Sequence, residues 1–241
     1  MEYISVFSHK SIGTGNYLVT ETYSPDFSVN AGVIVGGERI LVVDTGLGLG
    51  GNLRKYIESF AGTKLPIFCM CTHGDVDCIG GIGLFDEAYL NEADARMEDH
   101  FKLDFRLAAL SGITEDENMR SFGKLMASDI SGVRLRNMRQ GDHHHLGGVH
   151  VEVFEIPGIT PGSCAVRITR EGVARTSFVG DALDYDKVSR LTGENRKAYI
   201  EKLRELAEIM TEDEPMYGTH RSEPMVREDI TALADTLAAE A

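Results

Sequence analysis

The chain has 241 residues, of which 42% are hydrophobic and 26% are charged, with a formal net charge of −14. This composition excludes a disordered tail or a fibre and predicts a single globular domain over residues 1–241 with a sizeable core. The negative charge argues against nucleic acid or an anionic membrane as a partner, because both would repel the protein at long range.

The chain shows no basic segment followed by an apolar run at its start, and no stretch of the roughly 20 apolar residues that a bilayer span requires. We therefore expect a cytoplasmic protein. The cysteines are too few for a disulfide framework in a chain of this length, so reduced thiols are predicted. They are Cys69, Cys71, Cys78 and Cys164.

The first part of the chain predicts an antiparallel hairpin, in which residues 32–35 and 39–43 are apolar strands and two glycines between them form the turn. After a glycine-rich loop, a helix is predicted from the spacing of its apolar residues. These are Leu53, Tyr56, Ile57 and Phe60. A buried strand is predicted over residues 66–71.

The composition becomes typical of helices after this strand, and we predict a helical insertion at about 91–139. Its expected inward positions are Ala93, Met97, Phe101 and Leu107. Strands are then predicted over residues 149–153, 165–168 and 174–179.

Two amphipathic helices close the chain. Their apolar residues are Tyr199, Ile200, Leu203, Leu206 and Met210 in the first, and Val226, Ile230, Leu233 and Leu237 in the second. Because strands are followed by helices in both halves, the fold class predicted is α/β (α+β), a four-layer αββα sandwich of two mixed β-sheets flanked by helices.

The segment most informative about chemistry follows the strand at 66–71 and reads C-T-H-G-D-V-D-C-I-G-G. It places an imidazole, two carboxylates and a thiol within six residues, at a strand end where functional groups are commonly presented. These groups are His73, Asp75, Asp77 and Cys78. Asp181 and His220 end two further apolar strands in the same way.

Five motifs occur in an order that resembles the metallo-β-lactamase superfamily, from about residue 30 to the end of the chain. They are Asp44-Thr45-Gly46, the segment at 72–81, the segment P-G-I-T-P-G-S at 157–163, Gly180-Asp181, and His220. The chain departs from the family pattern at Asp75, Cys78 and Ile159, each of which stands where the family usually has a histidine. An isoleucine cannot bind a metal ion.

The resemblance implies two metal positions. The first would keep His73 and Asp75, with Asp181 as a bridge, and would lack its third histidine. The second would be built from four ligands, Asp77, Cys78, Asp181 and His220. Zinc accepts all of these donors, and a thiolate favours zinc or iron over magnesium or calcium, so one or two zinc ions are expected and iron is left open.

A charge argument independent of the family also predicts a cation. Three carboxylates and an ionised thiol would meet with no lysine or arginine in the motifs. Like charges at such range raise pKa values or require a bound cation.

We therefore predict a metal-dependent hydrolase that acts on a small-molecule ester, thioester, lactone or phosphoester through a water activated by the metal, with His73 or Asp75 orienting or deprotonating that water. The alternative is a protein of this fold that has lost catalysis and binds a ligand or partner, since three family histidines are missing. The retained Asp77, Asp181 and His220 favour the hydrolase. Redox chemistry at iron is a third reading, and a homodimer is left open.

Several of these residues also have plain structural interpretations. An aspartate at a strand end commonly caps a turn or a helix, and a buried cysteine such as Cys78 can simply fill space. Cys69 and Cys71 alternate on a buried strand and are expected in the core. The histidine triplet at 143–145 is predicted to lie on an exposed strand edge, away from the site.

Overall fold

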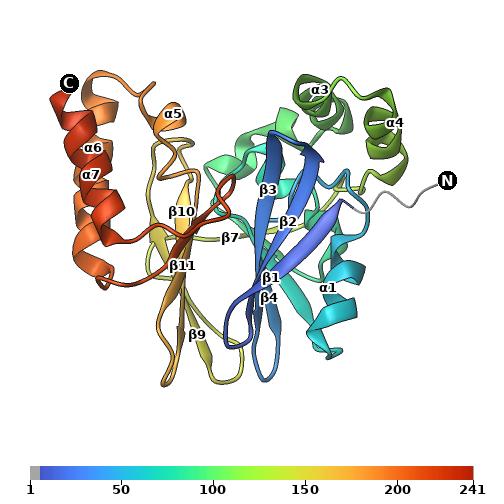
Figure 1. The fold of residues 1–241 in the computed structure, drawn as a ribbon, viewed down its shortest axis with the longest axis horizontal. Coiled ribbons are helices and arrows are strands. Elements are labelled where there is room, and N and C mark those ends of the chain that lie inside the picture. The colour runs from blue at the N-terminus through green and yellow to red at the C-terminus, as the bar shows by residue number, and fades with distance from the viewer. Residues whose placement is uncertain (1–5, 241) are drawn as a thin grey trace.

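The structure is a computed structural model that describes residues 6–240. Two β-sheets face each other, and helices cover their outer faces (Figure 1). Within the described residues, the first sheet has the order β1 (Phe7–Gly13), β2 (Asn16–Ser24), β3 (Phe27–Val35), β4 (Ile40–Val43), β5 (Ile67–Met70), β6 (Ala88–Leu90) and β7 (Leu135–Asn137). The second has the order β12 (Met216–Gly218), β11 (Thr176–Gly180), β10 (Cys164–Arg170), β9 (Val149–Glu155) and β8 (His143–His145).

The helices lie outside the two sheets and at one end of the sandwich, where Figure 1 places α3, α4 and α5. The α-helices are α1 (Leu53–Ala61), α2 (Val76–Ile79), α3 (Leu103–Ile113), α4 (Glu117–Met126), α5 (Tyr185–Val188), α6 (Gly193–Ile209) and α7 (Arg227–Ala239). Short 3-10 helices are η1 (Ile82–Leu84), η2 (Asp94–Arg96) and η3 (Glu98–Phe101).

Both sheets are mixed, as predicted. Strands β1 to β4 pair antiparallel, whereas β4 to β7 pair parallel. In the second sheet only β11 and β12 are parallel. The parallel pairs matter for function, because the carboxyl ends of parallel neighbours meet at the same edge of a sheet.

The core consists of apolar layers between the sheets and beneath the helices. The layer between the sheets includes Leu41, Val43, Phe68, Met70, Val151, Val153, Val166 and Ile168. Helix α1 packs on the first sheet, and α6 and α7 pack on the second. The predicted inward residues of α6 and α7 are buried, apart from Val226, which is half-buried just before α7 begins. The two amphipathic patterns therefore identified the faces that bury against the sheet.

The segment at 91–139 contains α3 and α4, and it ends in strand β7, which adds to the first sheet. The strand was not predicted. The positions expected to point inward, Ala93, Met97, Phe101 and Leu107, are half-buried, and the side chains that are buried in η2 and α3 are Asp94, Arg106 and Leu110. Two of these three are charged, so hydrophobic periodicity could not identify them.

Three smaller predictions concern the cysteines, the histidine triplet and membrane-spanning helices. All four cysteines are free and buried, and Cys69 and Cys71 belong to the apolar layer beneath α1. His143 and His145 are exposed on β8, an outer strand of the second sheet, whereas His144 between them is half-buried with its ring against that of Tyr89. No helix within residues 6–240 is long and apolar enough to cross a membrane.

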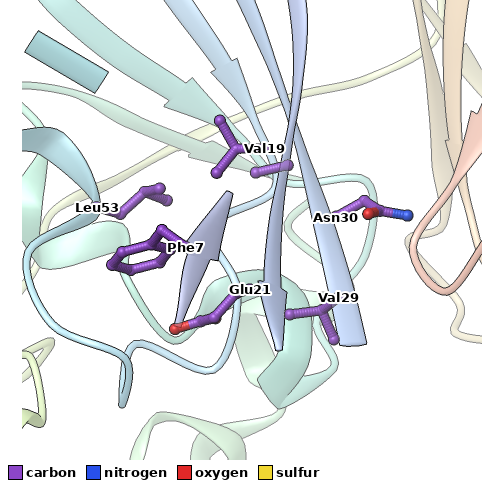
Figure 2. A pocket seen from close by; sticks show the side chains of 8 residues that line it. Phe7, Val19, Glu21, Val29, Asn30 and Leu53 are labelled. Atoms are coloured by element: carbon purple, nitrogen blue, oxygen red, sulfur yellow. The ribbon is translucent and has the colours of Figure 1, made fainter. Parts of the chain in front are cut away.

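A buried carboxylate on β2 holds the glycine-rich loop that leads to α1. Glu21 is 4% exposed and accepts hydrogen bonds from Leu47 N (3.1 Å), Gly50 N (3.0 Å) and the hydroxyl of Tyr23 (2.6 Å). Figure 2 shows Glu21 beside Phe7 and the other residues around a pocket of about 10 Å³. That volume holds at most about one water molecule, so the pocket is not a ligand site.

Glu21 predicts a pH-dependent stability. Burial raises its pKa from 4.5 to about 7, against the opposing effect of its three hydrogen bonds. Because the folded chain keeps a proton that the unfolded chain releases, the stability associated with protonated Glu21 is complete below pH 4.5 and is lost as the pH rises to about 7.

The measurement is the free energy of unfolding of the wild type and of Glu21→Gln across that range. We expect the wild type to lose about 3 kcal/mol relative to the variant between the lower and the upper pH. A difference that grows in favour of the wild type with rising pH would show that the hydrogen bonds stabilise the carboxylate instead.

Candidate metal centre

The predicted functional residues come from four strand ends that meet at one edge of the sandwich. Asp44 follows β4, and the loop with His73 and Asp75 follows its parallel neighbour β5. Asp181 follows β11, and His220 lies beyond the parallel strand β12. The parallel pairing of both strand pairs is what brings residues far apart in sequence together.

The segment Asp44-Thr45-Gly46 fixes the loop that carries these residues. Asp44 adopts a left-handed backbone (φ 62°), which is uncommon outside glycine. Its carboxylate accepts hydrogen bonds from Thr72 N (2.7 Å) and Thr72 Oγ1 (2.9 Å). The Thr45 hydroxyl donates to the carbonyl of Cys78 (2.8 Å) and accepts from Gly81 N (3.0 Å). The early motif therefore acts by holding the main chain on both sides of the candidate ligands.

The glycine pair after Cys78 allows this close approach. A Cβ atom on Gly80 would lie 2.0 Å from the carbonyl oxygen of Leu47, and one on Gly81 would lie 2.6 Å from the Thr45 carbonyl oxygen. The buried Arg106 of α3 donates to the carbonyl of Gly80 (2.8 Å), so the insertion supports the loop directly.

Asp94, on η2, connects the insertion to two further segments. It is 0% exposed and accepts hydrogen bonds from Gly74 N (2.8 Å), the Thr160 hydroxyl (2.5 Å) and Gly162 N (2.7 Å). Gly74 belongs to the loop after β5, and Thr160 and Gly162 belong to the P-G-I-T-P-G-S segment. A single carboxylate thus joins the insertion to two of the family motifs.

Candidate metal-binding atoms gather beside this framework in two overlapping groups, within each of which all atoms lie within 4.8 Å of one another. The first group is His73, Asp77 and Cys78, and the second is His73, Asp75, Asp77 and Asp181. His73 Nδ1 is 3.5 Å from the Cys78 sulfur, and His73 Nε2 is 3.2 Å from Asp181 Oδ2.

His220 lies at the side of these groups. Its Nε2 is 3.1 Å from Asp77 Oδ2 and 3.9 Å from Asp181 Oδ1, and its Nδ1 is 3.0 Å from the carbonyl oxygen of Ser28. The structure therefore brings together every residue of the predicted ligand set, although His220 belongs to neither of the two compact groups.

One carboxylate oxygen at this point suits a cation. Asp77 Oδ1 is buried and has no hydrogen-bond partner among the described residues. An unpaired buried polar atom is costly, and the negative charge of a carboxylate makes the cost larger. Imidazole, carboxylate and thiolate donors are the ones that zinc accepts, so the residues present fit a zinc ion.

The charges of the cluster depend on one another. Burial disfavours the charged form of His73, but the charge of Cys78 and the hydrogen bonds to Asp181 and Asp75 raise its pKa well above the ordinary value. Burial also opposes the charge on Asp181, yet His73 and Lys187 hold the pKa of that carboxyl well below its usual range. Burial raises the pKa of the Cys78 thiol, which a metal ion would reverse by binding the thiolate.

Lys187 is the residue of the site that sequence reasoning missed. The charge argument found no lysine or arginine in the motifs, but the Lys187 ammonium reaches Asp181 Oδ2 from α5. Asp77 and Asp75 add to the negative potential that raises the pKa of Lys187 against the effect of burial. The carboxylates are thus partly neutralised by the chain itself. Lys187 follows Asp181 by six residues in the sequence but belongs to no motif, so no sequence pattern pointed to it.

Ile159 and His100 are two further residues near the site. Ile159, where the family usually has a histidine, is half-buried against the apolar layer of α6 and α7, so it serves packing. His100 of η3, which had no predicted partner, lies at the edge of the site, with Nδ1 2.9 Å from the carbonyl oxygen of Gly74 and 3.6 Å from Asp75 Oδ1.

Comparison with known families agrees with the motif order and the fold. A family model described as the metallo-beta-lactamase superfamily matches residues 24–215. The chain belongs to the metallo-β-lactamase superfamily. The matched region includes the loop after β5 and Asp181, whereas His220 lies beyond it.

Among curated proteins, the chain is similar to proteins named acyl-coenzyme A thioesterase MBLAC2. The protein from Gallus gallus is 25% identical over 224 residues, which is 87% of this chain and 78% of the relative. The protein from Homo sapiens is also 25% identical over 224 residues, covering 80% of this chain and 75% of the relative.

Solved structures of the superfamily share the fold. A metallo-β-lactamase from Cronobacter sakazakii with a HARLDQ motif has a TM-score of 0.64 at 16% identity, covering 96% of this chain and 92% of that one. A metallo-β-lactamase family protein from Thermus thermophilus has a TM-score of 0.62 at 22% identity, covering 94% and 79%. These likenesses confirm the predicted sandwich of two mixed sheets.

Proposed function

We propose that this superfamily member is a zinc-dependent hydrolase that cleaves acyl thioesters of small molecules. The observation that carries the proposal is the buried group His73, Asp77 and Cys78, in which Asp77 Oδ1 has no partner among residues 6–240. The group offers nitrogen, oxygen and sulfur donors within reach of one ion, and this donor set favours zinc.

The choice of a thioester among the predicted substrate classes rests on the relatives. Proteins named acyl-coenzyme A thioesterase align with 80% or more of this chain and with three quarters or more of their own length. An ester, a lactone or a phosphoester receives no such support. The proposed place of action is the cytoplasm, where free and buried cysteines such as the four seen here are the rule.

The chemistry divides between the metal and the chain. A zinc ion in this site would polarise the thioester carbonyl and lower the pKa of water near it. Asp75 is the most accessible of the three carboxylates, with 29% of its side chain exposed, and lies 3.5 Å from His73 Nε2. Although burial alone would raise it, the pKa of Asp75 is held below its usual value by His73, so this carboxylate is charged at neutral pH and can accept a proton from water.

His73 has a positioning role in this scheme. It is 1% exposed and lies between the carboxylates of Asp181 and Asp75, at 3.2 and 3.5 Å. These contacts fix the ring and the carboxylate that would receive the proton. Asp181 is in turn held by His73 and Lys187, so its orientation does not depend on a single contact.

The test is release of free thiol from acyl-coenzyme A substrates by protein loaded with zinc. We expect hydrolysis by the wild type that disappears after chelation, returns with added zinc, and is absent from Asp181→Ala. Asp186→Ala on α5 is the matched control, since Asp186 is exposed, and it should retain activity. Equal rates for wild type and Asp181→Ala would remove the hydrolase proposal.

A protein that binds a ligand without turnover is the second candidate, favoured by Ile159, which cannot serve as a ligand and packs with the apolar core. The same measurements separate the two functions. Saturable binding of an acyl-coenzyme A at zinc-loaded protein, with no thiol released, would favour the binding protein over the hydrolase.

A further inference from the structure

Lys187 is placed in the candidate centre by a short element that starts just after Asp181. The Asp184 side chain accepts a hydrogen bond from Asp186 N (3.0 Å), and Lys187 N donates to the Asp184 carbonyl (3.2 Å). This turn directs the Lys187 side chain back to Asp181 Oδ2. The Lys187 side chain is 28% exposed, whereas that of Asp181 is 1% exposed, so the ammonium covers the carboxylate from the solvent side.

Asp181 presents its two oxygens to different neighbours. Oδ2 faces His73 Nε2 at 3.2 Å and also contacts the Lys187 ammonium. Oδ1 faces His220 Nε2 at 3.9 Å. Lys187 therefore stands on the side of Asp181 that the family pattern would give to the first metal position, together with His73 and Asp75.

The same side of the site has lost its other family ligands. Asp75 replaces one histidine, and Ile159 replaces another and packs into the layer under α6 and α7. The other compact group, His73, Asp77 and Cys78, keeps its donors, and Asp77 Oδ1 has no partner among the described residues. Ligand loss and the position of the ammonium thus coincide on one side of Asp181.

We infer that the Lys187 ammonium replaces one metal ion, so that the centre binds a single ion, held by His73, Asp77 and Cys78. This inference rests on the proposed function only in requiring a metal centre. The physical reason is repulsion: an ammonium and a divalent ion that share one carboxylate oxygen would lie a few ångströms apart in a partly buried site. Because the Lys187 ammonium already neutralises Asp181, a second metal ion would gain no net electrostatic attraction from that carboxylate.

The replacement is not equivalent in chemistry. An ammonium neutralises a carboxylate and donates hydrogen bonds, but it does not lower the pKa of water as a metal ion does. The single ion beside Asp77 would then be the one that matters for hydrolysis, while Lys187 keeps Asp181 charged and in place.

The test counts zinc ions bound to each chain. Protein is loaded with Zn²⁺, freed of excess metal and analysed for zinc and protein, and the affinity of each ion is measured by competition with a chelator. We expect one ion for the wild type and for Lys187→Arg, which keeps the charge. For Lys187→Met we expect two, with the added ion bound at least about tenfold more tightly than any second ion in the wild type.

Two further variants make the count decisive. Lys187→Gln removes the charge but keeps a hydrogen-bond donor toward Asp181, and it should also bind two ions, so the result does not depend on one variant folding. Lys202→Met on α6 is the matched control, since Lys202 pairs with the exposed Glu205, and it should bind one ion.

The outcomes separate this inference from the proposed function. Two ions in the wild type, or one ion in both neutral variants, would overturn the inference even if thioester hydrolysis is confirmed. The expected zinc counts, with no thiol released from acyl-coenzyme A by the zinc-loaded wild type, would overturn the proposed function and leave the replacement by Lys187 standing. Zinc bound by none of them would overturn both.

Discussion

Replacement of Asp77 by asparagine is expected to reduce zinc affinity by at least about 100-fold. Replacing a residue that only supports a metal ligand already costs up to about 100-fold, and Asp77 would be a ligand itself. Asp77 Oδ1 is the buried oxygen that has no partner among residues 6–240, and its charge is what a cation would satisfy. The amide can keep the contact with His220 through one oxygen, now 3.1 Å from the ring, so the site keeps its shape.

The same variant should behave differently without metal. We expect the metal-free Asp77→Asn protein to match the metal-free wild type in stability to within about 1 kcal/mol, because removal of a buried charge and loss of its ion pair with His220 oppose each other. Zinc affinity by chelator competition and unfolding by urea measure the two effects. Asp186→Asn, on the exposed face of α5, is the control and should change neither. A loss of metal-free stability with unchanged zinc affinity would make Asp77 a purely structural residue.

Replacement of Asp94 by alanine is expected to lower the free energy of unfolding by about 4 kcal/mol. The substitution leaves the backbone N–H groups of Gly74 and Gly162 without their acceptor in a buried place. The Thr160 hydroxyl loses the same acceptor but keeps a contact with Ser163 Oγ at 2.8 Å, so the two backbone groups account for most of the loss.

Urea unfolding measures this effect, with Asp99→Ala on η3 as the matched control. Asp99 is exposed and pairs with the exposed Lys102, so its removal should lower the free energy of unfolding far less than removal of Asp94. The loop after β5 should also lose its position in Asp94→Ala, with weaker zinc binding as a second sign. Equal stability of the two variants would show that the three segments are held together by other contacts.

Local sequence patterns identified much of the fold and most of the candidate site. The turn glycines between β3 and β4, the apolar faces of α6 and α7, and the order of the motifs predicted two mixed sheets covered by helices. Candidate metal ligands directly after apolar strands were recognisable because a strand end fixes where the next side chain lies. His73, Asp77 and Asp181 were found in this way, and the structure brings them together.

The parts that sequence reasoning missed are charged groups whose partners are distant in the chain. Glu21 meets Gly50, Arg106 meets Gly80, and Asp94 meets Gly162, and none of these pairs leaves a periodic or local signal. Lys187 was overlooked for a related reason, since only the turn of α5 directs its ammonium to Asp181.

The sequence by itself determined the superfamily, the layered architecture and the set of candidate ligands, because hydrophobic periodicity and motif order are local properties of the chain. The tertiary structure alone decided which side of Asp181 meets an ammonium and which oxygen of Asp77 is buried without a partner among the described residues. These depend on the packing of segments more than a hundred residues apart, which sets the distances between charges and hence the cations that the site can hold.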